Sequence, residues 1–166
     1  MSRRTVALMC VLSLCLAGVL TTARAAQAWK TYKGAWFAVK YPAGFTVTKR
    51  EANGAGFDGA SFTSPDGRVE FYVFSPQWWG KDPVWTQLKA GEKLVDTKTE
   101  GKGNSGAKWV TLSGPKGAYE RSYLVKYNKT LNTRHVFGYK YRNRAAYNAY
   151  KADYARFKGS LVQYAD

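Results

Sequence analysis

The feature that most constrains the fold of this 166-residue chain is the turn sequence Ser-Pro-Asp-Gly at residues 64–67, which lies between two apolar runs. Proline presets φ in a turn, aspartate can bond to the backbone ahead of it, and glycine accepts a positive φ. After the turn, Val69, Phe71 and Val73 alternate with Arg, Glu and Tyr, which is the period of a half-buried strand. Residues 59–80 therefore predict a β-hairpin that ends in a loop carrying Trp78 and Trp79.

The neighbouring segments predict further strands and a middle helix. Residues 34–47 indicate two short strands or one bent strand, and the polar, glycine-rich residues 49–59 indicate a loop. Asp82 as N-cap and Pro83 at the first helical position predict a helix that ends near Lys93. Residues 94–100 favour β-structure but alternate poorly, and a flexible connection is expected at 101–106. Three strands of an antiparallel meander are then expected at 107–113, 118–127 and 133–141.

The last segment has the period of a helix. Steps of three and four place one apolar stripe on it, formed by Tyr147, Tyr150, Tyr154, Phe157 and Leu161. Lys151, Arg156 and Lys158 lie off this stripe. A mostly antiparallel sheet with a middle helix and a terminal helix packed on it is an α+β sandwich.

The N-terminal residues resemble an export signal. Arg3 and Arg4 precede an apolar run at 6–20, and small residues at 23–25 or 26–28 offer cleavage sites. We therefore expect a signal peptide over residues 1–25, with cleavage as late as residue 28, and a single domain over 29–166. Both cysteines, Cys10 and Cys15, lie in that signal, so the mature chain would hold no disulfide and no cysteine-based metal site. The expected location is periplasmic or extracellular, with no membrane-spanning segment in the mature chain.

Two short motifs resemble those of a known superfamily. Residues 37–47 read Phe-Ala-Val-Lys-Tyr-Pro-Ala-Gly-Phe-Thr-Val and residues 62–69 read Phe-Thr-Ser-Pro-Asp-Gly-Arg-Val. With a helix, a meander and a last helix after them, they resemble the PsbP-like superfamily, the group of the extrinsic oxygen-evolving-complex subunit of photosystem II and its bacterial relatives. This resemblance implies an α-β-α sandwich and a non-enzymatic accessory or binding role. Some plant members hold metal ions through His and carboxylates. This sequence has one His and no acidic cluster, so neither a metal site nor a cofactor is expected.

The chain is strongly basic and rich in aromatic residues. Its formal net charge is +15, and it contains 6 Trp, 12 Tyr and 8 Phe, all after the expected signal. A basic, aromatic surface suits an anionic glycan, a nucleic acid or a negatively charged protein. The alternative is that the aromatic residues fill a sheet-rich core while the lysines keep the protein soluble.

Two candidate binding surfaces follow from this composition. The first is formed by Trp78, Trp79 and Trp85, whose indole faces can stack on sugars, bases or peptides, unless they form a hydrophobic clasp between hairpin and helix. The second is a basic run around the last two strands. Alternation in residues 133–141 places His135 on the aromatic face and the basic residues on the other, where they are available to anions or simply solvated. The run contains Arg121, Lys126, Lys129, Arg134, Lys140, Arg142 and Arg144.

No catalytic set is predicted from these residues. His135 is the single histidine and is expected to be a packed or surface ring. The predicted function is an exported, monomeric or weakly associating, non-catalytic binding or accessory protein, whose partner is an anionic envelope polymer or an acidic protein surface. The alternatives are a hydrolase acting on envelope glycan, which would need two carboxylates converging in a cleft, and a nucleic-acid binder, against which the export signal argues.

Overall fold

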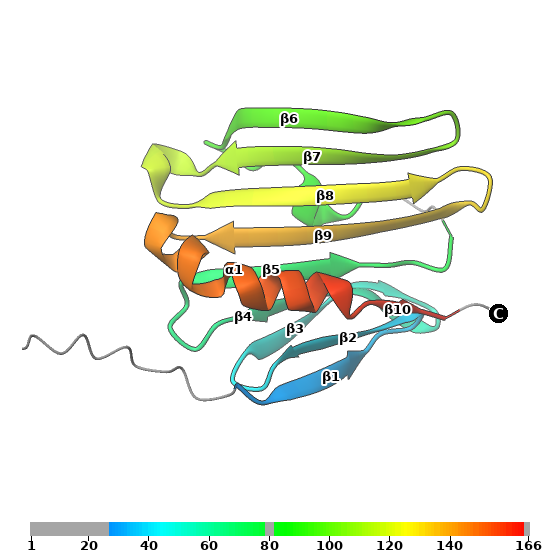
Figure 1. Cartoon of the computed structure of the whole chain (residues 1–166), viewed down its shortest axis with the longest axis horizontal. Coiled ribbons are helices and arrows are strands. Elements are labelled where there is room, and N and C mark those ends of the chain that lie inside the picture. Colours follow the sequence, from blue (N-terminus) through cyan, green and yellow to red (C-terminus); the bar gives the residue numbers. More distant parts are fainter. Residues whose placement is uncertain (1–26, 79–81, 165–166) are drawn as a thin grey trace, which may run out of the picture.

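The computed structural model describes residues 27–78 and 82–164, which form two antiparallel sheets and one α-helix. The small sheet has the order β1-β2-β10. Its strands are β1 (Trp29–Lys33), β2 (Phe37–Pro42) and β10 (Val162–Gln163), so it joins the two ends of the described chain. Figure 1 shows this sheet and the helix on the same side of the larger sheet.

The large sheet contains seven strands in the order β3-β4-β5-β9-β8-β7-β6, and each pair of neighbours is antiparallel. The meander predicted at 107–141 is confirmed as β7, β8 and β9. The strands are β3 (Thr46–Asn53), β4 (Gly56–Thr63), β5 (Val69–Phe74), β6 (Lys93–Lys102), β7 (Ser105–Ser113), β8 (Glu120–Asn128) and β9 (Thr133–Tyr141).

The hairpin predicted from the Ser-Pro-Asp-Gly turn is confirmed as β4-β5. Gly67 has φ +65°, and its N–H donates to the carbonyl oxygen of Ser64 at 2.9 Å. The Asp66 carboxylate accepts from the Ser64 hydroxyl at 2.6 Å and from the Tyr150 hydroxyl, which belongs to the terminal helix, at 3.1 Å. The turn therefore fixes the hairpin locally and also ties it to the helix.

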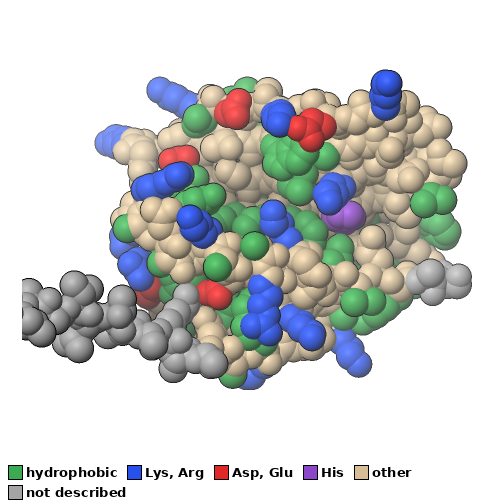
Figure 2. Space-filling model, viewed as in Figure 1, with side chains coloured by type: hydrophobic (Ala, Val, Ile, Leu, Met, Phe, Trp, Pro, Cys, Tyr) green, Lys and Arg blue, Asp and Glu red, His purple; other side chains and the backbone are tan. Residues whose placement is uncertain are grey.

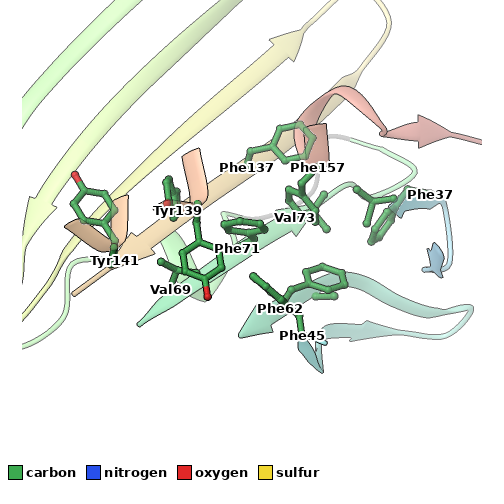
Figure 3. Packing of buried hydrophobic residues seen from close by; sticks show 14 residues of the cluster. Phe37, Phe45, Phe62, Val69, Phe71, Val73, Phe137, Tyr139, Tyr141 and Phe157 are labelled. Carbon is green, nitrogen blue, oxygen red and sulfur yellow. The ribbon is translucent and has the colours of Figure 1, made fainter. Parts of the chain in front are cut away.

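The predicted C-terminal helix is confirmed as α1 (Arg144–Gly159). Asn143 caps it, because its side-chain oxygen accepts from the Ala146 N–H at 2.9 Å. Along the stripe, Tyr150 and Phe157 are buried against the sheet. The Phe157 ring lies 5.2 Å from Phe62 and 5.4 Å from Phe71, centroid to centroid, and Figure 3 shows these side chains converging between α1 and the sheet. Burying this stripe is what holds α1 on the sheet.

The middle helix predicted at 82–93 is wrong. Residues 82–92, which we call the strap, contain a single 3₁₀ turn at Val84–Thr86 and a turn at Lys89–Glu92, and they cross the opposite face of the sheet without forming an α-helix. The backbone carbonyls of Trp85 and Gln87 accept from the guanidinium of Arg121 on β8. These groups therefore serve tertiary hydrogen bonds in place of helical ones, which overrides the local start signal of Asp82 and Pro83.

The structure also differs from two other local predictions. Residues 49–59, expected to be a loop, form most of the β3-β4 hairpin, and residues 101–106 form a tight turn between β6 and β7. On β5, Tyr72 and Phe74 are buried as well as Val69, Phe71 and Val73, because the strap covers the face that the alternation left to solvent. The α+β class holds in its coarse form, but the described chain is predominantly β, and its second covering layer is the strap, not a helix.

The expected signal peptide lies outside the described residues. Among the described helices, none has the length and apolar character needed to cross a membrane.

Candidate functional site

Of the three tryptophans predicted as a binding cluster, Trp85 is a core residue. Its ring stacks on Tyr72 at 5.0 Å with an interplanar angle of 4°, and its Nε1–H donates to Glu70 Oε1 at 2.8 Å. The ring lies directly over Gly138 on β9, where even a Cβ atom would come within 2.4 Å of it. Trp85 is thus the clasp that was the alternative prediction, joining the strap to the sheet.

Trp78 lies apart from Trp85. Its side chain is 57% exposed, and it borders a hollow of about 280 Å³ that is also lined by Trp36 and Tyr164. Trp79 lies outside the described residues. The structure therefore separates the predicted tryptophan surface into one buried ring and one exposed ring.

Arg121, predicted to attract anions, is fully buried beneath the strap. Its Nε donates to Glu92 Oε1 at 2.7 Å and its Nη2 to Glu92 Oε2 at 2.6 Å, a bidentate pair. The Tyr119 hydroxyl also donates to Glu92 at 2.8 Å, and the hydrogen bonds from Arg121 are the main cause that lowers the pKa of Glu92. Since every part of this guanidinium serves the strap, Arg121 is unavailable to a partner in this conformation.

The other basic residues predicted to form the patch also differ in burial. Arg134 is only 4% exposed; it pairs with Asp82 of the strap and lies over the Phe74 ring at 5.7 Å. Lys140 is half-buried, with Nζ 4.4 Å from the Tyr119 ring centroid. Arg142 and Arg144 are exposed, and the Arg144 guanidinium lies 4.7 Å from the Tyr147 ring centroid. The predicted patch is therefore not one surface, because two of its arginines stabilise the strap instead.

A different basic and aromatic surface lies on the helix side of the sheet. The helix α1 packs on β2, β5 and β9. Figure 1 shows that β8, β7 and β6 continue the sheet to one side of the helix. The strand register places Lys126 opposite His135 and Leu124 opposite Phe137, on the face that carries α1. Three adjoining hollows follow the angle between α1 and these strands, and we call them together the trough.

The central hollow of the trough has a volume of about 400 Å³ and two lysines in its wall. Lys126 comes from β8 and Lys158 from the last turn of α1, with His135 and Gln163 beside them. Its floor is apolar, formed by Leu124, Phe137 and Leu161, and no carboxylate lines it. Figure 2 shows the histidine of this face among lysine and arginine side chains.

The two outer hollows extend this surface in both directions. One, of about 520 Å³, is bounded by Lys151 and Lys158 and has a wall of four tyrosines, namely Tyr139, Tyr141, Tyr147 and Tyr154. Tyr139 and Tyr154 stack there with centroids 4.6 Å apart. The other, of about 560 Å³, lies toward the β6-β7 turn and is lined by Lys102, Lys126 and one carboxylate, Glu100. The hollows share lining residues, Lys158 on one side and Lys126 on the other, so the three hollows adjoin one another.

The charges within the trough perturb one another. Burial and the nearby Lys126 ammonium lower the pKa of His135 to about 4, so the ring is neutral at pH 7. The same two causes lower the pKa of Lys158. Burial and the Glu120 carboxylate, to which its hydroxyl donates at 3.1 Å, raise the pKa of Tyr141 to about 12. Besides burial, the lowered pKa values of His135 and Lys158 both reflect repulsion from the Lys126 ammonium. An anion placed between Lys126 and Lys158 would relieve that repulsion.

Most residues of the trough were not predicted as a site from the sequence. Lys151 and Lys158 lie off the apolar stripe of α1 and were assigned to no surface, and Lys126 was grouped with the arginines. A signal for Lys126 did exist: it follows Leu124 by two positions in a strand, which puts both on one face. The position of Lys158 depends on how α1 sits on the sheet, for which the sequence carries no local signal.

No group of three or more His, Cys, Asp or Glu side chains that could hold a metal ion occurs in residues 27–78 and 82–164. Glu100 is the single carboxylate lining the trough, and its partner is Lys98 at 2.5 Å.

The fold is PsbP-like. The solution structure of the cyanobacterial PsbP protein CyanoP from Synechocystis sp. PCC 6803 superposes with a TM-score of 0.52 at 11% sequence identity, covering 86% of this chain and 96% of that one. At this identity the likeness shows the fold alone, and it confirms the PsbP-like fold that the two motifs predicted.

Two further solved structures are similar to a lesser degree. A protein from Bacteroides thetaiotaomicron VPI-5482 has a TM-score of 0.46 at 15% identity, covering 84% of this chain and 49% of that one. The Saccharomyces cerevisiae Ran-binding protein Mog1p has a TM-score of 0.44 at 10% identity, covering 83% and 96%. No protein-family model and no curated protein sequence matches the chain.

Proposed function

We propose that this chain is an exported, non-catalytic binding protein that holds an anionic polymer of the cell envelope in the trough. The observation that carries this proposal is the central hollow, where Lys126 and Lys158 from different elements face the same apolar floor with no lining carboxylate. Two ammonium groups brought together without a counter-charge cost free energy in the empty protein. Binding an anion there returns that free energy.

The shape and the aromatic wall favour an extended ligand. A polymer that places one acidic group between Lys126 and Lys158 continues over Lys102 on one side and past Lys151 on the other. Tyrosine rings bind the faces of sugar rings through their apolar surface while their hydroxyls stay hydrated. An acidic polysaccharide therefore matches the trough better than an acidic protein surface, which would have to insert a loop.

Binding is tested by titrating the purified protein with polygalacturonate, followed by calorimetry at about 0.15 M ionic strength, where the Debye length is ~8 Å. The variant Lys126→Gln/Lys158→Gln removes two charged contacts of about 1.5–3 kcal/mol each, so we expect at least a tenfold (~1.4 kcal/mol) loss of affinity. The matched control is Lys30→Gln/Lys33→Gln, two exposed residues of β1 that lose the same net charge outside the trough. The control should retain nearly full affinity.

Equal weakening in both variants would mean that net charge, and not the trough, attracts the polymer, and the proposed site would be rejected. Binding of poly-glutamate with equal affinity and the same dependence on Lys126 and Lys158 would shift the partner class to an acidic protein. Release of reducing ends from a glycan by the purified protein would instead support the hydrolase alternative.

The export part of the proposal is tested separately. The basic, apolar and small-residue order of residues 1–28 supports cleavage. Intact-mass measurement of protein from its native host should find a chain that begins near Ala26 or Trp29. A mass that retains Met1 would refute export by a cleaved signal.

A further inference from the structure

Strand β6 forms an open edge of the large sheet. It is the last strand in the order β3-β4-β5-β9-β8-β7-β6 and pairs with β7 along one side. In the described part of the chain nothing pairs with its other side, and all ten of its residues are exposed. A long edge of this kind presents a row of backbone N–H and C=O groups that can pair with another strand.

The charges on this edge alternate in sign. Asp96, Lys98, Glu100 and Lys102 occupy every second position of β6 and therefore share one face of the sheet. In the β6-β7 register, Lys98 lies opposite Trp109 and Lys102 lies opposite Ser105. Ser105 lines one hollow of the trough, so these side chains lie on the side of the sheet that carries the trough. Charged side chains on an edge strand hinder its pairing with another strand, unless the incoming strand places opposite charges at the facing positions. This edge presents a regular order of acid, base, acid, base.

We propose that β6 pairs antiparallel with β6 of a second copy of this chain, with Thr99 opposite Thr99 at the two-fold axis. In this register Asp96 faces Lys102 of the second copy, and Lys98 faces Glu100. The two-fold axis repeats both contacts, so four cross-strand pairs of opposite charge form at once. The strand is its own electrostatic complement.

Neighbouring registers lack this match. A two-fold axis perpendicular to the sheet lies between the two strands, and paired side chains must share a face, so one residue of β6 must lie opposite its own symmetry copy at the axis. Centring the pair on Lys98 or Glu100 sets like charges against each other at the axis. Centring it on Thr97 or Gly101 keeps two of the four opposite-charge pairs. The charge order therefore selects Thr99.

The dimer would join the two large sheets into one continuous sheet with both helices on the same side. Each trough would then lie on the same broad face as its symmetry mate, with the paired edges between them. A long polymer held in one trough could continue into the other, which raises its effective concentration at the second site. This consequence rests on the proposed function, whereas the pairing of β6 does not.

The pairing is tested with two charge-swapped variants of the purified protein. Lys98→Glu/Lys102→Glu makes all four charges of the edge acidic, and Asp96→Lys/Glu100→Lys makes all four basic. Analytical ultracentrifugation at ~0.15 M ionic strength should show a concentration-dependent dimer for the native protein and at least tenfold weaker association for each variant alone. Mixed in equal amounts, the two variants should restore dimers, because every pair is again of opposite charge. Both keep a strongly positive net charge, so their overall fields repel.

The matched control is Lys30→Glu/Lys33→Glu on β1, which has the same change in net charge as the acidic variant and should leave the dimer intact. Circular dichroism and thermal unfolding should be native-like for all variants, because the changed side chains are exposed. A native protein that stays monomeric at every concentration measured would overturn the proposal. So would a mixture that fails to associate, or variants that dimerise as well alone as the native protein does.

Discussion

The substitution Glu92→Gln tests what holds the strap on the sheet. Glu92 and Arg121 are both buried, and their side chains form the bidentate pair that also receives the Tyr119 hydroxyl. Gln keeps the size of the side chain but removes its charge. The guanidinium of Arg121 would then stay beneath the strap without a compensating carboxylate.

The magnitude of the loss follows from burial. Removing one partner of a buried ion pair costs about 3–5 kcal/mol, because the remaining charge is uncompensated. The lowered pKa of Glu92 gives a second figure for the same interaction. The pKa of Glu92 falls from its ordinary value of 4.5 to about 2. At 1.36 kcal/mol for each pKa unit this corresponds to about 3 kcal/mol. Against a typical stability of 5–15 kcal/mol this is a large fraction.

The sign of the pH effect is fixed by the direction of this shift. A carboxyl whose pKa is lowered by folding contributes its full stabilisation above the unfolded value of 4.5. That contribution is lost as pH falls from about 4.5 toward 2. In the native protein the free energy of unfolding should therefore decline across this window, and the Glu92→Gln variant should lack that part of the decline.

Urea unfolding at pH 7 and pH 3, followed by circular dichroism, measures both effects. The matched control is Glu100→Gln, which breaks the Lys98–Glu100 salt bridge of 2.5 Å, where both side chains are more than half exposed. Exposed pairs of this kind contribute about 0–1 kcal/mol. A loss in Glu92→Gln no larger than in Glu100→Gln would refute the assignment of the strap's stability to the buried pair.

Three further outcomes are expected. Gly67→Val should lower stability by about 1–3 kcal/mol, because the backbone at φ +65° strains a β-branched residue while the space around it is open; an unchanged melting temperature would contradict this. Gly138→Ala should cost about 1–3 kcal/mol and displace the Trp85 ring, seen as a change in tryptophan fluorescence, since its Cβ would meet that ring at 2.4 Å. His135, the single histidine, should titrate near pH 4 by proton NMR; a midpoint near 6.5 would show that the ring is solvated and far from Lys126.

Several parts of the fold were determined by short stretches of sequence. The turn around Gly67 forms because proline, aspartate and glycine each satisfy one requirement of the same four residues. The helix α1 forms because its apolar residues recur with a period of 3.6 and because Asn143, directly before it, caps its first turn. The meander strands also carry their own turn signals. In each case the interacting groups lie within a few positions of one another, so a short stretch of sequence contains all the information needed to predict the element.

The strap and the trough were decided by the tertiary structure. Arg121 is separated from Glu92 by 29 positions and from Trp85 by 36, and hydrogen bonds to this distant guanidinium hold residues 82–92 as the strap in place of the predicted helix. An arginine in a sequence carries the same charge whether it is solvated or buried against a carboxylate, so its burial could not be read locally. Lys126 and Lys158 line the same hollow because α1 packs on β9, the strand next to β8, a placement set by the packing of many side chains at once. Alternation within a strand tells which residues share a face, but what covers that face depends on the rest of the chain.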